Sequence, residues 1–215
     1  MPARVVVSSE AGVADVRLSR PDKLNALDGA MFEELIEAGR SLARDPSLRA
    51  VVLSGEGRAF CAGLDFPSFQ AGGTAVDLFA RNAESPANVA QRAPWIWTEL
   101  PVPVIAAVHG YAFGGGLQLA LGADLRIVTP DVQLSVMEIR WGLVPDMAGT
   151  PVLERKRSLN VLPARRLAGK AHPLPRQPRP RGRAPLRVWE RGAVVLPVGP
   201  LHSACVLAAL SGHDG

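Results

Sequence analysis

Apolar residues in the first 150 positions follow two periods, one typical of strands and one typical of helices. From Met31 to Leu42 they recur every three or four residues behind Asp28. This spacing predicts a helix that Asp28 caps and that a following Asp-Pro pair ends. The glycines at 114–116 predict the start of a second helix. Short runs of mainly β-branched residues predict strands at 5–8, 13–19, 50–53, 104–108, 124–129 and 132–135. Strands that alternate with helices indicate an α/β fold.

The pattern changes near residue 151. Residues 151–215 hold 9 of the 19 prolines and 12 of the 24 basic residues, but only 3 of the 20 acidic ones. Proline removes backbone donors, and few large apolar residues are available to form a core. We therefore predict a folded domain at 1–152 and an Arg/Pro-rich, disordered tail at 153–215, with no regular structure over 154–192. No element is predicted for the mixed stretch 66–94 either.

Composition and charge exclude several classes of protein. No apolar run is long enough to span a bilayer, and the N-terminus lacks the plan of a signal peptide. The two cysteines, Cys61 and Cys205, have no metal-ligand spacing. These features predict a cytoplasmic protein with no membrane partner and no metal site. The basic tail contains a single aromatic residue, Trp189, and no recognised nucleic-acid module, so no nucleic-acid partner is expected.

Three segments contain the candidate chemistry, namely AFCAGLD (59–65), HGYAFGGGLQ (109–118) and MEIRWGLVPD (137–146). Three glycines at a helix start expose unpaired N–H groups, which suit an anion. A phosphate loop usually adds Lys and Ser/Thr after the glycines, whereas Leu117 and Gln118 follow here. The pattern therefore favours a carbonyl oxygen that gains negative charge during a reaction. A close packing contact between strand and helix is the alternative.

Together with RPDKLNAL (20–27), these segments resemble the signature stretches of the crotonase (enoyl-CoA hydratase/isomerase) superfamily, in order and spacing, over about residues 3–150. The resemblance implies a spiral of ββα turns and a coenzyme A thioester substrate, with no separate cofactor. It also implies a homotrimer or a dimer of trimers. Backbone N–H groups of Leu64 and Gly115 would hold the thioester oxygen. The residues implied to bind the substrate are Lys23, Asn25, Ala26, Leu27, Ala62, Gly63, Asp65 and Gly114.

The catalytic positions depart from the pattern of the family's hydratases, which place two glutamates around one water. The first position is Gln118 here and the second is Glu138. Because glutamine cannot exchange protons, the simplest chemistry is a double-bond isomerisation with Glu138 as the only base. Asp146 matches a position that is acidic in some members, including dienoyl-CoA isomerases. Hydration by Glu138 with Asp146, or with a water held by Gln118, is the alternative.

The family normally continues with helices that cover the CoA site and join subunits, and no such region is recognisable after residue 152. Two origins of the tail stay open: a degenerate form of that region, or a shifted reading frame in a GC-rich gene, which the abrupt change of composition favours. A third hypothesis for function follows, in which the chain is a truncated, non-catalytic CoA-binding product.

Overall fold

The computed structural model describes residues 2–70, 85–155 and 161–163. Its larger sheet has the order β1-β2-β3-β4-β6-β8; β1 and β2 are antiparallel and every other neighbouring pair is parallel. The strands of this sheet are β1 (Val5–Glu10), β2 (Val13–Leu18), β3 (Ala50–Gly55), β4 (Val104–Val108), β6 (Leu125–Val128) and β8 (Val161–Pro163). A smaller parallel pair consists of β5 (Tyr111–Phe113) and β7 (Gln133–Ser135).

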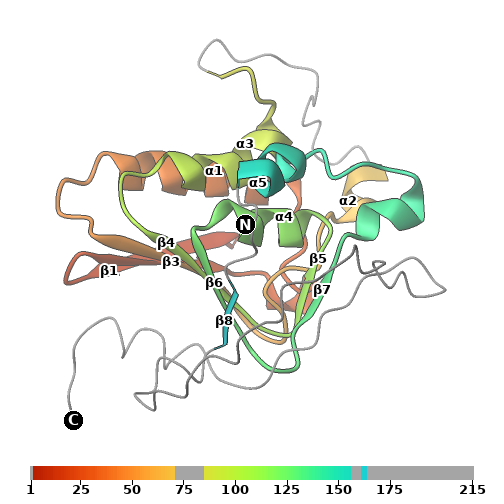
Figure 1. The fold of residues 1–215 in the computed structure, drawn as a ribbon, viewed down its shortest axis with the longest axis horizontal. Coiled ribbons are helices and arrows are strands. Elements are labelled where there is room, and N and C mark those ends of the chain that lie inside the picture. The colour runs from red at the N-terminus through yellow and green to blue at the C-terminus, as the bar shows by residue number, and fades with distance from the viewer. Residues whose placement is uncertain (1, 71–84, 156–160, 164–215) are drawn as a thin grey trace, which may run out of the picture.

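Helices α1, α3, α4 and α5 lie over one side of the larger sheet, and α2 lies to one side of them (Figure 1). The α-helices are α1 (Gly29–Ala43), α2 (Phe66–Gln70), α3 (Val89–Trp95), α4 (Gly115–Gly122) and α5 (Gly149–Arg155). Single-turn 3₁₀ helices are η1 (Pro21–Lys23), η2 (Ile96–Glu99) and η3 (Met137–Trp141). None of the helices in the described ranges is long and apolar enough to cross a membrane. The mixed α/β class and the ββα repeats confirm the fold predicted from the sequence.

Helix α1 forms as its sequence predicts. The Asp28 side chain accepts a hydrogen bond of 2.9 Å from the Met31 N–H, which satisfies one of the unpaired donors of the first turn. Met31, Leu35 and Leu42 lie on the buried face. On the same face Gly39 approaches Ile96 so closely that a β-carbon there would lie 2.5 Å from the isoleucine side chain. This close contact fixes α1 against η2.

Each turn of the spiral adds one strand to the large sheet and then a short segment to a second ladder. After β3 the chain reaches Cys61, which bridges to Ala112 on β5. After β4 it enters β5, and after β6 it enters β7. The second ladder therefore brings the loop that follows β3 next to the start of α4. This is the junction at which the candidate site lies.

Strand β8 lies inside the stretch for which the sequence predicts no regular structure. Its residues pair in parallel with Arg126–Val128 on β6. For these three positions the prediction of disorder is wrong, because a parallel partner strand supplies hydrogen bonds that local sequence does not reveal. Residues 153–155, also predicted to belong to the disordered tail, form the end of α5, so the prediction is wrong there as well. The remaining residues of the predicted tail, including Cys205, lie outside the described residues, so their predicted disorder and the possible shifted frame stay predictions.

Candidate active site

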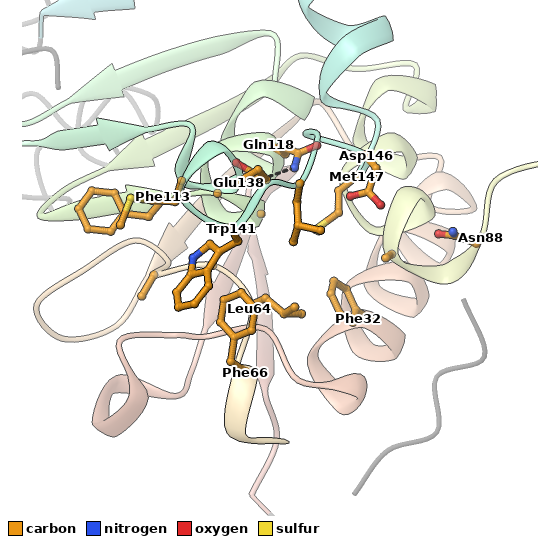
Figure 2. A pocket seen from close by; sticks show the side chains of 17 residues that line it. Phe32, Leu64, Phe66, Asn88, Phe113, Gln118, Glu138, Trp141, Asp146 and Met147 are labelled. Atoms are coloured by element: carbon orange, nitrogen blue, oxygen red, sulfur yellow. Dashed lines mark hydrogen bonds between the residues drawn. The ribbon is translucent and has the colours of Figure 1, made fainter. Parts of the chain in front are cut away.

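A cavity of about 400 Å³ opens where the loop after β3, the start of α4 and the segment 137–147 meet. Its walls are mainly apolar, with Phe32, Leu64, Phe66, Phe113 and Trp141 around the polar groups. The rings of Phe66 and Trp141 lie against each other, with centroids 4.9 Å apart. Figure 2 shows Phe66 and Trp141 below Glu138 and Gln118, with Phe113 to one side. An apolar cavity with few polar groups suits the acyl part of a small ligand.

Two backbone N–H groups at this cavity have no acceptor among the described residues. They belong to Leu64, in the loop after β3, and to Gly115, the first residue of α4. On both sides of Leu64 the backbone is pinned to Leu27, which donates to Gly63 at 2.8 Å and accepts from Asp65 at 3.0 Å. The two free donors therefore lie on backbone that neighbouring segments hold in place.

Glycine is required at two positions of this junction. Gly63 has φ +93°, and a β-carbon there would lie 2.6 Å from the carbonyl oxygen of Phe113. Gly114 has φ +51°, and a β-carbon there would lie 3.3 Å from Oε1 of Glu138. A side chain at either position would strain the backbone and crowd the free N–H groups of Leu64 and Gly115 or the Glu138 carboxylate. The glycines thus bring the backbone close to the space that a ligand would occupy.

Glu138 lies on η3 beside Gln118 of α4. The Gln118 amide donates through Nε2 to Oε1 of Glu138 at 2.6 Å, and its Oε1 accepts from the Gly149 N–H at 2.9 Å. Because a backbone N–H can only donate, this second bond fixes which end of the amide faces the carboxylate. The other oxygen of Glu138, Oε2, is buried and has no partner among the described residues. A buried carboxylate oxygen without a partner is rare, and in a residue that lines a cavity it indicates a candidate catalytic group.

Asp146 also lines the cavity, but its residue is exposed to solvent. In Figure 2 it lies on the side of the cavity toward Asn88, at the start of α3. Like Asp146, the residues Ala62, Gly63, Leu64, Gly114, Gly115, Gln118 and Glu138 were predicted from the sequence, and the structure brings them together around this cavity.

The other predicted substrate-binding residues do not line the cavity, and for three of them the side chain has a different role. Asn25 is fully buried and bonds to backbone groups of Arg20, Glu56 and Ala59. It holds the loop in which both Leu24 and Asn25 have positive φ. These bonds turn the amide of Asn25 inward, so contact of Asn25 with the CoA moiety would be through its backbone and stays a prediction.

The side chains of Leu27 and Asp65 also face inward, and backbone contact of these residues with the CoA moiety likewise stays a prediction. Leu27 is fully buried in the core beneath Gly115. Asp65 accepts from Arg20 at 2.7 Å and from the Ser68 hydroxyl at 2.8 Å. Burial alone would raise the pKa of Asp65, but these two hydrogen bonds hold it below its ordinary value.

Lys23 is exposed and Ala26 half-buried on the segment that flanks the cavity. That segment and the loop after β3 are joined by a hydrogen bond of 2.9 Å from the Ala62 N–H to the Leu24 carbonyl. Contact of Lys23 or Ala26 with the CoA moiety stays a prediction.

Sequence reasoning missed several contributors to the site. The aromatic walls come from elements far apart in the chain. Phe113 and the exposed Trp141 lie within segments singled out for their chemistry, whereas Phe32 and Phe66, with Met147, do not. The buried Arg126 on β6 was missed as well. It donates at 2.7 Å to the Ala123 carbonyl at the end of α4, which suits the negative end of a helix. Burial lowers the pKa of Arg126. Arg126 therefore anchors the helix whose other end presents Gly115.

Comparisons with known proteins agree with this geometry. The sequence profile described as enoyl-CoA hydratase/isomerase matches residues 8–161. The Delta(3,5)-Delta(2,4)-dienoyl-CoA isomerase of Mus musculus is 33% identical over 152 residues, which cover 66% of this chain and 45% of the relative. The 1,2-epoxyphenylacetyl-CoA isomerase of Escherichia coli is 37% identical over 148 residues, or 68% and 55% of the two chains.

A solved relative from Thermobifida fusca YX, in complex with acetoacetyl-CoA, is 34% identical with a TM-score of 0.59; the match covers 71% of this chain and 61% of that one. The chain spans about half the length of the curated relatives it matches. A profile match over more than half of the residues, together with the cavity geometry, is decisive for the family. The chain belongs to the enoyl-CoA hydratase/isomerase family.

Proposed function

We propose that this protein isomerises the double bond of an enoyl-CoA thioester through an enolate, with Glu138 as the base that takes the proton from one carbon and returns it to another. The substrate class is supported by the relatives, whose names specify CoA thioesters, and by the solved complex with acetoacetyl-CoA. The proposed chemistry uses the thioester itself and needs no cofactor.

The two free N–H groups support the enolate step. Removal of a proton beside a thioester places negative charge on its oxygen. Donors on Leu64 and Gly115, fixed by the surrounding backbone, would stabilise that charge as it develops. Loss of one such donor typically raises the barrier by about 2.7–4 kcal/mol. Because both donors belong to the backbone, the leucine side chain itself has no part in this step.

The direct hydrogen bond between Gln118 and Glu138 is the observation that favours isomerisation over hydration. At 2.6 Å no water fits between the two groups, although hydratases of this family activate a water between two glutamates. The Gln118 oxygen is also occupied by Gly149. Gln118 therefore orients Glu138 and cannot itself exchange a proton. One carboxylate that both takes and returns a proton is sufficient for isomerisation.

One observation favours hydration as a second candidate function. Asp146 lines the same cavity as Glu138, and its exposed carboxylate has access to water. A water between these two carboxylates would give the acid and the base that addition to a double bond requires. The same pair could also serve as two proton carriers in a dienoyl-CoA isomerisation, the reaction named for the mouse relative.

A single assay separates these reactions from a non-catalytic CoA-binding product. Purified protein is incubated with a 3-enoyl-CoA and, separately, with a 2-enoyl-CoA, and the absorbance of the conjugated thioester is followed. The proposal predicts a rise with the first substrate and little change with the second. Loss of absorbance with the second substrate would establish hydration instead. Binding of both thioesters with no change in either would support the non-catalytic product. The oligomeric state that the resemblance implies, a homotrimer or a dimer of trimers, can be measured on the same sample.

A further inference from the structure

The segment that leads into α5 contacts both halves of the proposed active site. Met147 packs against the start of α4, where a β-carbon on Gly115 would lie 2.7 Å from the methionine sulfur. Two residues later, the buried N–H of Gly149 donates to Oε1 of Gln118 at 2.9 Å. Gln118 in turn donates to Glu138 at 2.6 Å (Figure 2). A stretch of three residues therefore reaches one oxyanion donor directly and the proposed base through a single side chain.

The backbone of this segment is strained at its middle residue. Ala148 has φ +60°, a conformation that places the β-carbon of an alanine close to the following carbonyl oxygen. Such strain persists only where surrounding contacts determine the conformation, and it is concentrated at functional sites. Here both neighbours of Ala148 make such contacts, Met147 with the start of α4 and Gly149 with Gln118. These two contacts hold the chain in a conformation that alanine rarely adopts.

Position 149 has no room for a side chain, and one neighbour alone fills the nearest space. A β-carbon on Gly149 would lie 2.6 Å from Oε1, 3.0 Å from Cδ and 3.2 Å from Cγ of Gln118. These three nearest atoms belong to the outer part of one flexible side chain. An alanine at position 149 would therefore displace the Gln118 amide and leave the surrounding backbone in place.

We propose that Gly149 is a positioning residue for the reaction, because its N–H and its missing β-carbon together hold the Gln118 amide in the orientation that directs Glu138 toward the substrate. This inference rests on the proposed function. The N–H binds the amide oxygen, which leaves the amide nitrogen for the carboxylate. The missing β-carbon leaves the space that the amide occupies. Displacement of the amide would remove the donor that fixes Oε1 of Glu138.

Gly149→Ala tests the proposal, because it keeps the N–H and changes mainly the contact with Gln118. Alanine is a better helix former than glycine, so a purely structural role for Gly149 in α5 predicts normal turnover. A positioning role predicts that kcat for a 3-enoyl-CoA falls by roughly 10–100-fold while KM changes little, because a small displacement of a catalytic group has effects of that order. Thr150→Ala, at the exposed next position of α5, is the matched control and should keep the kcat of the wild type.

A double variant shows whether Gly149 acts through Gln118. Gln118→Ala removes the three atoms that the new β-carbon would meet, so Gly149→Ala should have no further effect on kcat in that background. An equal loss with and without the Gln118 side chain would overturn the proposal, as would a wild-type kcat in Gly149→Ala. Circular dichroism checks the fold, and an unfolded Gly149→Ala would also overturn it, since the amide and not the backbone is expected to move. Any of these results with an active wild type removes only this inference. A wild type without isomerase activity removes the proposed function and this inference with it.

Discussion

The Arg20 guanidinium donates to the Asp65 carboxylate at 2.7 Å, and both side chains are about nine-tenths buried. Asp65 follows Leu64, one of the two proposed oxyanion donors. The same nitrogen of Arg20 also donates to the Ala26 carbonyl at 3.1 Å, next to Leu27, whose backbone holds both sides of Leu64. Arg20 thus joins the two segments that fix one donor of the oxyanion site, although it does not line the cavity.

Replacement of Arg20 by methionine should therefore weaken oxyanion binding more than CoA binding. We expect kcat/KM to fall by roughly 10–100-fold, because a small displacement of a catalytic donor has effects of that order. The specific measurement is the enolate absorbance of bound acetoacetyl-CoA, compared with the affinity for free CoA. Arg17→Met is the control, since Arg17 also forms an ion pair, with Asp15, outside the loop. If Arg20→Met leaves the enolate absorbance of bound acetoacetyl-CoA unchanged, or lowers it only as much as it lowers the affinity for free CoA, Arg20 has no positioning role.

The Asp65 carboxyl predicts how this pair responds to acid. Because its pKa in the folded protein is below the ordinary 3.8, the stability it contributes is present above that value and is lost as the pH falls through the folded-state pKa. Asp65→Asn should be less stable than the wild type at neutral pH, and the difference should shrink below about pH 3.8. Urea unfolding at a series of pH values measures it. A constant difference across the series would show that the charge of Asp65 is not responsible.

The periodic pattern of apolar residues correctly predicts the helix and strands that bury one face in the core. The six predicted strands and α1 lie within about two residues of their predicted positions, since period and cap are local features. Helix α3 was missed because Pro94 lies inside it, although Asn88 and Gln91 form a complete capping box. The 3₁₀ turn that presents Glu138 has no periodic signal at all.

The sequence predicted which segments form the site, but not which side chains in them contact one another. The motifs correctly indicated that Glu138, Gln118 and the proposed oxyanion donors lie together, but they could not show which side chains face the cavity. Asn25 illustrates the reason, because its direction depends on backbone partners more than 30 residues away. The bond from Gly149 to Gln118 likewise joins residues 31 apart. No local pattern encodes contacts of this kind.

Substitution of the proposed base gives the direct test of mechanism. Glu138→Gln keeps the shape of the side chain and an oxygen that can accept from Gln118, so the cavity should stay intact. We expect isomerisation to fall by at least ~10²-fold with thioester affinity nearly unchanged. Asp146→Asn is the matched comparison and should lose much less. Similar losses in the two variants would favour a mechanism that needs both carboxylates.

Burial raises the pKa of the Cys61 thiol to about 12, so it should stay protonated and unreactive in the folded protein. In a Cys205→Ser background, iodoacetamide should label Cys61 only after unfolding. Above about pH 9 the unfolded chain ionises this thiol while the folded protein does not, so stability should fall as the pH rises from there toward 12. Cys61→Ala should remove that part of the pH dependence. Rapid labelling of the native protein at neutral pH would contradict the buried position.

Gln118→Glu tests whether the lost second carboxylate decides the reaction. Two carboxylates at the spacing of the Gln118–Glu138 bond cannot both carry a charge, so the pair should share a proton and provide an acid and a base together. The Gly149 N–H can still donate to the new side chain, which keeps the start of α5 in place. We expect the ratio of hydration to isomerisation to rise, measured on the same enoyl-CoA pair. Gln118→Met, which removes the bond without adding a carboxylate, should lower isomerisation and leave hydration absent. If Gln118→Glu leaves the ratio unchanged while the protein stays folded, the spacing of the two groups, and not the identity of residue 118, determines which reaction the site supports.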